Sequence, residues 1–489
     1  MIRADGRLGH ELSPEEHLPQ DACGVFGIYA PNEDVARLTY FGLYALQHRG
    51  TESAGIAVSD GEAIMVYKDM GLVAQVFNDS ALDALTGKIA VGHTRYSTTG
   101  ATNWENAQPT FHVGQQRQIA LGHNGNLMDV NKLHQKLHAG NRVLTGKGIR
   151  GTSDTELVAA LIASNPAETT ITALKEELLE LKGAYSFVLT DATSLIGARD
   201  PQGIRPLVIG QLNDGWVITS ETAALDIVGA KYLRDVEPGE IVVIDETGMS
   251  SHTFAPSNPA HCLFEYVYLA RPDTVLTGRS VHATRVEIGR KLAQEHPAPA
   301  DLVIPVPDSG TPAAVGYAQA SGIPFAQGLI KNAYVGRTFI QPTQTIRQLG
   351  IRMKLNPLRE VIAGRRLVVV DDSIVRGNTQ RAIVKMLKDA GALEVHVRIS
   401  SPPVLWPCFY GIDFAQKEEL IANGKTIDEI RESIGADSLG FASLELLTAA
   451  TKLPADNLCR ACFDGKYPIE VAEDVKRGKL HRELPMLNG

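Results

Sequence analysis

The segment LVVVDDSIVRGNT, residues 367–379, carries the clearest structural signal in this 489-residue chain. Its β-branched run predicts a buried parallel strand at Leu367–Val370. Two carboxylates, Asp371 and Asp372, follow directly, and a turn of small and polar residues leads to a helix expected from Gln380. Open α/β sheets bind ligands at the carboxyl ends of strands, and a helix N-terminus favours anions. The segment therefore predicts a site for a phosphorylated sugar, although many α/β proteins have a strand, an acidic residue and a turn without that chemistry.

The residues around this segment alternate between strands and helices. Further strands are predicted at Leu302–Pro305 and Val395–Ile399, and helices at Thr311–Ala320 and Gln380–Ala390. Such alternation predicts an α/β domain with a mainly parallel sheet.

The N-terminal half is rich in strands instead. Strands are expected at Gly24–Tyr29, Ala54–Val58, Ile89–Gly92, Ile119–His123, Ser186–Thr190 and Trp216–Thr219, and helices at Val35–His48, Asp154–Ser164 and Thr169–Lys182. Strands in runs, apart from clustered helices, predict a layered α+β domain. The sequence loses periodicity across Asp245–Pro259, so the expected domains are residues 23–255 and 256–489.

Composition limits the possible classes of function. The length predicts two or more domains, and the net charge of −9 with a pI near 5.9 argues against general nucleic-acid or membrane-surface binding. Residues 1–22 contain many charges and no hydrophobic core, so they do not form a signal peptide, and a cytoplasmic location is expected. Five cysteines, an odd number, indicate thiol or metal chemistry rather than a disulfide framework.

The segment 367–379 resembles the signature of type I phosphoribosyltransferases, which bind phosphoribosyl pyrophosphate (PRPP). The resemblance implies that Asp371 and Asp372 contact the ribose hydroxyls or the metal. It also implies that the 5′-phosphate is wrapped by a loop made of Ser373, Ile374, Val375, Arg376, Gly377, Asn378 and Thr379. Val306–Thr311 would be the pyrophosphate loop, and Ser309 would position Mg²⁺ with the two aspartates.

Residues 331–354 form a basic segment without an acidic residue, and they contain Lys331, Arg337, Arg347, Arg352 and Lys354. In an acidic protein such a segment indicates contact with a polyanion, with a solvated surface loop as the alternative. It resembles the flexible loop that closes over PRPP in glutamine PRPP amidotransferases, which assigns PRPP contacts to Lys331, Tyr334, Arg337 and Lys354.

Cys23 stands alone in sequence, and a buried structural thiol is the ordinary fate of such a residue. Four polar or Gly-rich strings follow it, at Gln47–Gly50, Gly92–Ser97, Gly122–Asn126 and Thr152–Glu156. Together they resemble the N-terminal-nucleophile (Ntn) glutaminase domain of class II amidotransferases, a four-layer αββα fold. That family has its nucleophilic cysteine as residue one of the mature chain, so residues 1–22 are expected to be a propeptide. A free α-amino group, with a pKa of about 7.7–8, can then take the thiol proton.

The resemblance also assigns roles around Cys23. The Asn124 side chain and the Gly125 N–H would form the oxyanion hole. Arg95 would bind the α-carboxylate of glutamine, Asp154 its α-ammonium group, and Arg49 with Gly50 would add contacts. The alternatives are a surface ion pair for Arg95 and a plain hairpin turn at Asn124–Gly125. His48, His93 and His123 are interpreted as packing or hydrogen-bonding residues.

The remaining cysteines are Cys262, Cys408, Cys459 and Cys462. By number they suit zinc and an iron–sulfur cluster equally well, and the pair 459/462 alone could be a redox pair. Their surroundings resemble the [4Fe–4S]-bearing subgroup of glutamine PRPP amidotransferases, where the cluster is structural.

The combined resemblance implies that ammonia from glutamine passes to C1 of PRPP. The products would be 5-phospho-β-D-ribosylamine, glutamate and pyrophosphate, in the first committed step of purine synthesis. It further implies Mg²⁺, purine nucleotide inhibitors and a homotetramer, and Tyr96, Tyr334 and Ile340 are candidates for an ammonia passage. Two rivals are a class II amidotransferase with another acceptor and a PRPP-sensing or RNA-binding regulatory protein.

Overall fold

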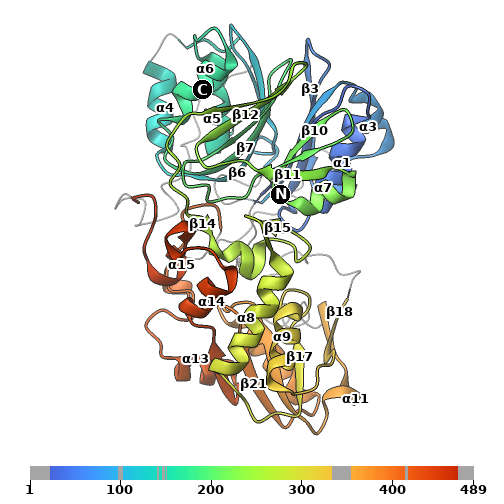
Figure 1. Cartoon of the computed structure of the whole chain (residues 1–489), viewed down its shortest axis with the longest axis vertical. Helices are drawn as coiled ribbons and strands as arrows, with labels where there is room; N and C mark the ends of the chain where they lie inside the picture. The colour runs from blue at the N-terminus through green and yellow to red at the C-terminus, as the bar shows by residue number, and fades with distance from the viewer. Residues whose placement is uncertain are drawn as a thin grey trace, which may run out of the picture. The chain divides into compact units, whose positions relative to one another are not determined.

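The computed structural model describes residues 23–96, 103–139, 142–145, 149, 151–332, 354–412 and 417–471, which form two compact units (Figure 1). The larger unit contains the described parts of 23–284, 406–412 and 448–471. The smaller contains the described parts of Arg285–Leu405 and Lys417–Leu447. The expected propeptide, 1–22, lies outside the described residues. The sequence-based limits, 23–255 and 256–489, differ from this division because three segments beyond residue 255 pack with the larger unit.

Two antiparallel sheets form the centre of the larger unit. The first has the order β11-β9-β10-β1-β4-β2-β3 and the second β13-β12-β8-β7-β6-β5. The first contains β1 (Gly24–Tyr29), β2 (Ser53–Ser59), β3 (Ile64–Met70), β4 (Ile89–Arg95), β9 (Val208–Gln211), β10 (Trp216–Thr219) and β11 (Lys231–Asp235). The second contains β5 (Thr110–Val113), β6 (Gln118–Leu127), β7 (Gly183–Thr190), β8 (Leu195–Arg199), β12 (Glu240–Asp245) and β13 (Gly248–Thr253).

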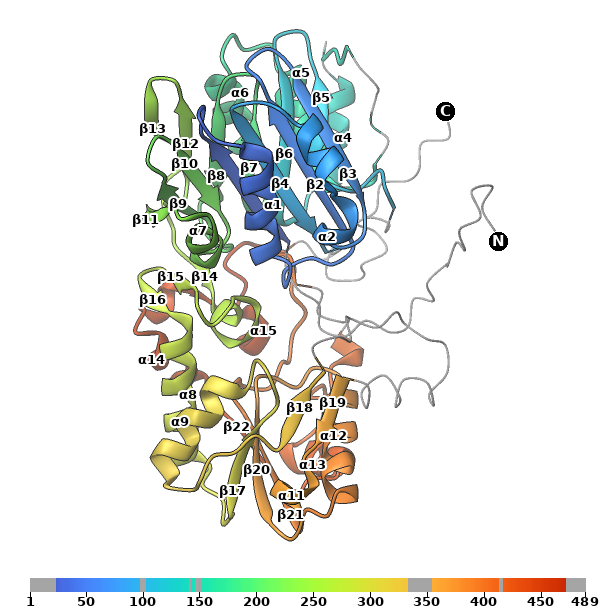
Figure 2. The ribbon, with the colours of Figure 1, turned by 90° about the vertical axis from the view of Figure 1, so that its right-hand side faces the viewer.

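The sheets are stacked face to face, with helices on both outer faces (Figure 2). Val25 and Val91 of the first sheet share one buried cluster with Val188 and Val242 of the second. The first sheet is covered by α1 (Val35–Ala45), α2 (Val73–Val76), α3 (Asp79–Ala84) and α7 (Thr222–Val228). The second is covered by α4 (Val130–Ala139), α5 (Asp154–Ser164) and α6 (Thr170–Leu178). The four-layer αββα prediction is confirmed.

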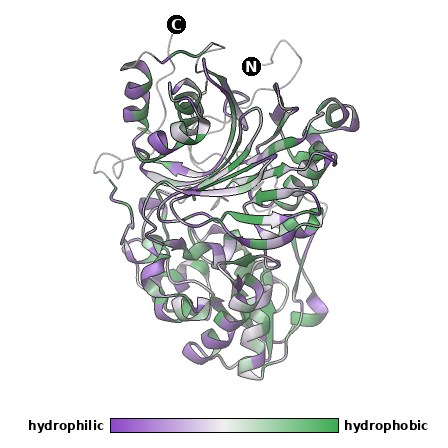
Figure 3. Cartoon of the chain, turned by 45° about the horizontal axis from the view of Figure 1, so that its top comes forward, coloured by the Kyte–Doolittle hydropathy of each residue, from purple (hydrophilic) through white to green (hydrophobic). Residues whose placement is uncertain are grey.

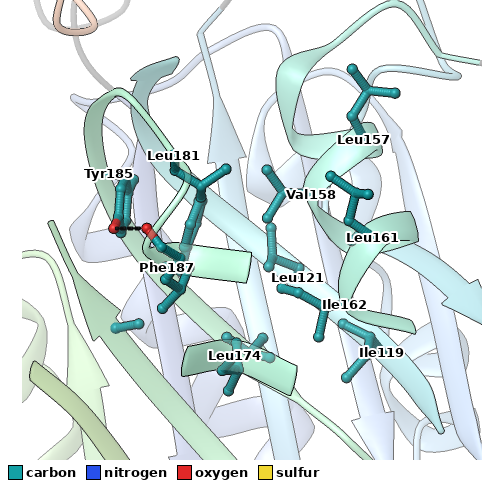
Figure 4. Packing of buried hydrophobic residues seen from close by; sticks show 14 of the residues in the cluster. Ile119, Leu121, Leu157, Val158, Leu161, Ile162, Leu174, Leu181, Tyr185 and Phe187 are labelled. Carbon is teal, nitrogen blue, oxygen red and sulfur yellow. Dashed lines mark hydrogen bonds between the residues drawn. The ribbon is translucent and has the colours of Figure 1, made fainter. Parts of the chain in front are cut away.

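Helix α5 shows why the outer layers form. Its residues are buried along the whole length, and Val158, Leu161 and Ile162 lie beside Leu121 and Ile119 of β6 (Figure 4). Figure 3 shows hydrophobic residues along the strands of the sheets and many hydrophilic residues on the helices. Burying each large apolar side chain stabilises the fold by about 1.5–3 kcal/mol, and these contributions hold the layers together.

The smaller unit contains a four-stranded parallel sheet in the order β17-β20-β21-β22. These strands are β17 (Leu302–Pro305), β20 (Arg366–Asp371), β21 (Glu394–Ile399) and β22 (Ser438–Phe441). The unit's helices are α9 (Thr311–Ser321), α11 (Arg359–Ile362), α12 (Asn378–Asp389) and α13 (Ile427–Ile434), while α8 (Val281–Glu295) and α14 (Leu444–Thr451) run across the limits of the units. The predicted parallel sheet is confirmed.

Short elements complete both units. The larger unit adds β14 (His261–Cys262), a π-helical turn η1 (Glu265–Leu269), β15 (Val275–Leu276), β16 (Arg279–Ser280), the 3-10 turn η3 (Ala455–Asn457), β23 (Leu458–Cys459) and α15 (Ala461–Asp464). The smaller adds the 3-10 turn η2 (Lys417–Glu419) and the antiparallel pair β18 (Leu329–Lys331) and β19 (Leu355–Pro357). No helix in the described part of the chain combines the length and apolar composition needed to cross a bilayer.

Some predicted boundaries need correction. Helix α1 ends at Ala45 rather than His48, and α6 covers Thr170–Leu178 rather than Thr169–Lys182. The segment Asp245–Pro259, expected to be irregular, contains strand β13, which pairs with β12 in register. Its sequence, GMSSHT, is polar because the strand lies at the sheet edge and none of its residues is buried.

Candidate functional site

Cys23 lies directly before β1, beside the end of β4. The Gly24↔Thr94 register places it next to Arg95 and Tyr96. Its Sγ donates to the Tyr96 carbonyl at 3.3 Å and accepts from the Tyr96 N–H at 3.4 Å. Burial raises the pKa of the Cys23 thiol to about 11, opposed by the Tyr96 N–H and Arg95 and aided by Glu52 and Asp154. The thiol is therefore protonated at neutral pH and needs a base to become a nucleophile.

Asn124 and Gly125 lie on β6, in the sheet that faces β1. The Asn124 side chain is fully buried, and neither its Nδ2 nor its Oδ1 has a hydrogen-bond partner among the described residues. Buried amides are normally paired, so an unpaired one indicates a group reserved for a ligand. Gly125 has φ +147°, and a Cβ there would lie 2.0 Å from the Ala184 carbonyl oxygen, so only glycine fits.

Arg95 and Asp154 are both close enough to Cys23 to influence its charge. Arg95 is 2% exposed, with Nη1 3.4 Å from Oε2 of Glu52. Asp154 opens α5 and accepts from the Leu127 N–H, at the end of β6, at 2.9 Å. Burial acts to raise the pKa of Asp154, but His123 and backbone N–H groups lower it below its usual value. The two predicted glutamine ligands, Arg95 and Asp154, thus lie near Cys23, at the ends of β4 and β6.

The side chain of Arg49, a predicted glutamine contact, is held by two carboxylates. It is fully buried, forming ion pairs with Glu221 and, from Nη2 at 2.7 Å, with Glu265 Oε2. These pairs fix its guanidinium within the protein, and its contact with glutamine stays a prediction. Gly50 packs on the end of β4, where a Cβ would lie 2.5 Å from the Thr94 carbonyl carbon.

The three histidines have hydrogen-bonding positions, in line with their interpretation as structural residues. His48 Nε2 lies 2.7 Å from Glu221 Oε1, His93 Nε2 lies 2.9 Å from the His123 carbonyl oxygen, and His123 Nδ1 lies 3.1 Å from Thr155 Oγ1. Burial lowers the pKa of His93 to about 3.

The four remaining cysteines line one small cavity in the larger unit. Cys262 and Cys459 are register partners on β14 and β23, and Cys408 and Cys462 complete the lining with Arg205. Burial raises the pKa of Cys262 to about 11, and that of Cys459 and Cys462 well above the usual value. In the described part of the chain, no three His, Cys, Asp or Glu side chains converge closely enough to bind one metal ion.

Arg205 is the residue at this cavity that sequence reasoning missed. It is fully buried, donates from Nε to the Tyr410 carbonyl at 2.9 Å, and has Nη1 3.2 Å from Glu265 Oε1. Its Nη2 has no partner among the described residues. The sequence gives one indication that Arg205 is buried, which is its position between the apolar residues Ile204 and Leu207.

The end of β20 gathers the predicted phosphoribosyl residues. Ser309 Oγ donates to Asp372 Oδ2 at 2.5 Å, and Ser373 Oγ donates to Asp372 Oδ1 at 2.6 Å. Asp371 accepts from Gln380, which sequence reasoning missed, at the start of α12. Burial raises the pKa of both aspartates, and each lies beside the other's carboxylate.

The loop from Ser373 to Thr379 turns tightly into α12. Ile374 and Val375 are 3% exposed, so they can offer a ligand only their backbone groups. Arg376 pairs with Glu419 at 2.6 Å, and Gly377 caps α12, whose first residues are Asn378 and Thr379.

Lys331 and Lys354 mark the two stems of the basic segment. Lys331 closes β18 and has Nζ 2.5 Å from Asp308 Oδ2, in the expected pyrophosphate loop. The Lys354 carbonyl accepts from the Asn332 N–H at 2.9 Å. Tyr334, Arg337, Ile340, Arg347 and Arg352 lie outside the described residues. The other passage candidate, Tyr96, is 8% exposed beside Cys23.

Two domain families match the chain. A glutamine amidotransferase domain matches residues 93–226, and a phosphoribosyl transferase domain matches residues 283–400. The first match falls on the larger unit, and the second falls on the smaller unit except for its first two residues.

Full-length relatives are similar over nearly the whole chain. The amidophosphoribosyltransferase of Mycobacterium tuberculosis is 58% identical over 475 residues, covering 95% of this chain and 90% of the relative. That of Bacillus subtilis is 49% identical over 461 residues, covering 93% and 96%. A solved structure described as the allosteric regulatory enzyme of purine biosynthesis gives a TM-score of 0.87 at 48% identity, covering 95% of this chain and all of that one. The B. subtilis glutamine PRPP amidotransferase complexed with ADP and GMP gives 0.85 at 48% identity, covering 92% and 98%.

Proposed function

The chain belongs to the amidophosphoribosyltransferases, glutamine amidotransferases of purine biosynthesis, and we propose how its residues divide that family's reaction. Cys23 in the larger unit attacks the glutamine amide. The smaller unit holds PRPP at the end of β20, where ammonia replaces pyrophosphate at C1. The observation that carries this proposal is the buried amide of Asn124, which has no hydrogen-bond partner among the described residues. Asn124 lies on β6, and the end of this strand contacts Asp154, which influences Cys23.

Nucleophilic attack needs the thiol proton of Cys23 to be removed. Among the described residues, the sulfur hydrogen-bonds to the N–H and carbonyl groups of Tyr96, and burial holds its pKa near 11. Removal of residues 1–22 would give Cys23 a free α-amino group, which accepts that proton and later delivers it to the leaving ammonia. The tetrahedral oxyanion would receive hydrogen bonds from Asn124 Nδ2 and the Gly125 N–H, and each such donor is worth about 10²–10³ in rate.

Glutamine would be oriented by charge at its α-carbon. Arg95 supplies a bidentate donor for the carboxylate, with Glu52 holding the guanidinium in place. Asp154 supplies the acceptor for the ammonium group, because its lowered pKa keeps it ionised. Arg49, occupied by Glu221 and Glu265, would fix the turn that presents the Gly50 backbone.

The residues at the end of β20 fit Mg²⁺. Two adjacent carboxylates and the Ser309 hydroxyl form an oxygen donor set, and magnesium commonly uses one or two carboxylates together with substrate phosphates. Bound there, Mg²⁺ would supply charge neutralisation to the departing pyrophosphate. Lys331, Arg376 and the N-terminal N–H groups of α12 contribute positive charge for the phosphates. The basic segment 331–354 would close over PRPP and keep ammonia away from water, which would protonate it.

We propose that the four cysteines hold a [4Fe–4S] cluster, in which each thiolate would bind its own iron. Their sequence surroundings resemble the cluster-bearing subgroup, and the four residues line one shared cavity. Zinc is the alternative, because four thiolates suit it equally well. Arg205, with Nη2 unpaired among the described residues, offers positive charge and a donor to sulfur. The cluster would hold together three segments distant in sequence.

Feedback inhibition and assembly are part of the proposal. The solved B. subtilis relative holds ADP and GMP, so we expect purine nucleotides to inhibit this chain. A homotetramer is expected from the family, and light scattering of the purified protein would test it.

The test uses anaerobically purified protein whose N-terminal residue is checked by mass spectrometry. Glutamate and pyrophosphate release are followed together with glutamine, PRPP and Mg²⁺, and Cys23→Ala is the control. We expect one-to-one release that the variant loses with glutamine but retains with ammonia. Glutamate release without pyrophosphate would refute the acceptor. Full glutamine turnover by a chain that retains residues 1–22 would refute the propeptide.

Metal analysis of the same protein tests the cluster. Iron and acid-labile sulfide in equal amounts would support the cluster, and zinc alone would refute it.

A further inference from the structure

Gly411, three residues after Cys408, packs against the backbone of Gly125 in the expected oxyanion hole. It is buried, with φ +103°. A Cβ at this position would lie 2.9 Å from the carbonyl carbon of Gly125, 3.0 Å from its Cα and 3.1 Å from its carbonyl oxygen. Two backbones therefore lie in direct contact, and neither has a flexible side chain that could move aside.

A second contact joins the same two segments. Asn126 Nδ2 donates to the Phe409 carbonyl at 3.1 Å, and Asn126 is 2% exposed. Residues 125 and 126 of β6 thus contact residues 411 and 409. These contacts lie within the larger unit, although the two segments are 283 residues apart in sequence.

The other side of residues 408–411 is held at the cysteine cavity. The Tyr410 N–H donates to Cys408 Sγ at 3.4 Å, and the Tyr410 carbonyl accepts from Arg205 Nε at 2.9 Å. The Tyr410 hydroxyl donates to the Ile469 carbonyl at 2.8 Å. The segment therefore has cavity-lining groups on one side and the Gly125–Asn126 backbone on the other.

We propose that the segment Cys408–Gly411 positions the oxyanion hole, with Gly411 as the positioning residue. It contacts no substrate itself. It fixes where the Gly125 N–H points, and it makes glutamine hydrolysis depend on the order of the cysteine site. This inference rests on the oxyanion role proposed above for Asn124 and Gly125.

The expected effect follows from the geometry. An oxyanion donor acts within about 2.7–3.1 Å, and a site tolerates displacement of only about 0.5 Å. A methyl group at residue 411 would start 2.9 Å from the Gly125 carbonyl carbon and would push this backbone by a comparable amount. Loss of the Gly125 donor alone is worth about 10²–10³, so we expect kcat with glutamine to fall at least about 10-fold. KM for glutamine should change little, because ground-state binding uses other residues.

The variant Gly411→Ala should be compared with Gly248→Ala. Gly248 has a similar φ of +110° in the same unit, but a Cβ there meets nothing within 4 Å, so it carries the same backbone strain without the contact. Both variants are assayed anaerobically with PRPP and Mg²⁺, using either glutamine or ammonia. We expect Gly411→Ala to lose kcat with glutamine only, and Gly248→Ala to keep both activities. Equal kcat values with glutamine in the two variants would overturn the inference.

Two further variants separate the possible failures. Asn126→Ala removes the contact to Phe409 without inserting an atom, so this variant decides the question if Gly411→Ala does not fold. A lower kcat with glutamine and unchanged ammonia-dependent activity would support the inference. An unchanged kcat with glutamine would refute it. Asn124→Ala tests the oxyanion hole directly. If Asn124→Ala retains full kcat, the proposed oxyanion hole is wrong. If Asn124→Ala loses kcat while the Gly411 and Asn126 variants keep it, only the positioning role is wrong.

Discussion

Replacement of Glu265 should cost the larger unit much stability with little change in side-chain shape, because this buried carboxylate pairs with two guanidinium groups. It is 2% exposed, and its carboxylate lies 2.7 Å from Arg49 Nη2 and 3.2 Å from Arg205 Nη1. Glu265→Gln keeps the volume but leaves both guanidinium groups without this counter-charge. Arg49 still has the Glu221 carboxylate, whereas Arg205 keeps the Tyr410 carbonyl, which carries no charge.

Breaking a buried ion pair by removing one partner costs about 3–5 kcal/mol. We expect the free energy of unfolding to fall by this amount in Glu265→Gln, a large share of a typical total of about 5–15 kcal/mol. At about 2–4 °C per kcal/mol for a domain of this size, the melting temperature should drop by about 6–20 °C. Urea unfolding under anaerobic conditions measures the change, provided that the slope m is unchanged.

The matched control is Asp83→Asn. Asp83 lies 2.6 Å from Arg37, slightly closer than Glu265 lies to Arg49, but its side chain is 65% exposed. Exposed pairs contribute little, so this variant should unfold like the parent. Equal losses in the two variants, or a loss below about 1 kcal/mol in Glu265→Gln, would refute the reasoning that burial rather than distance determines the cost.

Three other predictions concern single residues. Arg95→Lys should raise KM for glutamine about 10-fold or more, because Lys cannot form the bidentate contact, while ammonia-dependent activity is unchanged; an unchanged KM would contradict the role. Asp371→Asn should weaken PRPP binding about 30-fold or more, as expected for losing a buried charge partner worth about 2–5 kcal/mol. The same variant should be more stable than the parent at neutral pH. Burial raises the pKa of Asp371, so its protonated form stabilises the fold at low pH and this stabilisation is lost as pH rises, whereas the asparagine of the variant stays neutral. Isothermal titration measures the loss of PRPP binding, and urea unfolding measures the gain in stability. His93 has its pKa lowered from about 6.5 to about 3, so its neutral form stabilises the fold above pH 6.5, and about 2 kcal/mol is lost by pH 5; His93→Gln should flatten that part of the stability profile, and parallel profiles would contradict it.

The sequence predicted the elements whose pattern is local. Strands β1 and β10 and helix α5 have the predicted bounds because their apolar runs end at clear polar or Gly signals. Strand β13 was missed because its exposed position at the sheet edge permits a polar sequence, and only pairing with β12 keeps it extended. Periodicity reports burial, so an exposed strand gives a weak signal.

The candidate site shows the same limit for side chains. The motif around Asn124 is visible in the sequence. Only the packed structure shows that the amide has no hydrogen-bond partner among the described residues. The sequence also showed no sign of the ion pairs of Arg49, whose partners are 172 and 216 residues away. Local patterns therefore identify which residue types are present, and the fold determines which of them are already occupied.

The cysteine cavity has a consequence for the order of synthesis. Cys262 is synthesised 200 residues before Cys462, and the described part of the smaller unit is made between them. At about 5–20 residues per second, the interval is roughly 10–40 s. The layered sheets can form during that time, but the nascent chain lacks three of the four thiols until Cys408 is made. Cys459 and Cys462, made after the smaller unit, thus complete the unit that was begun first.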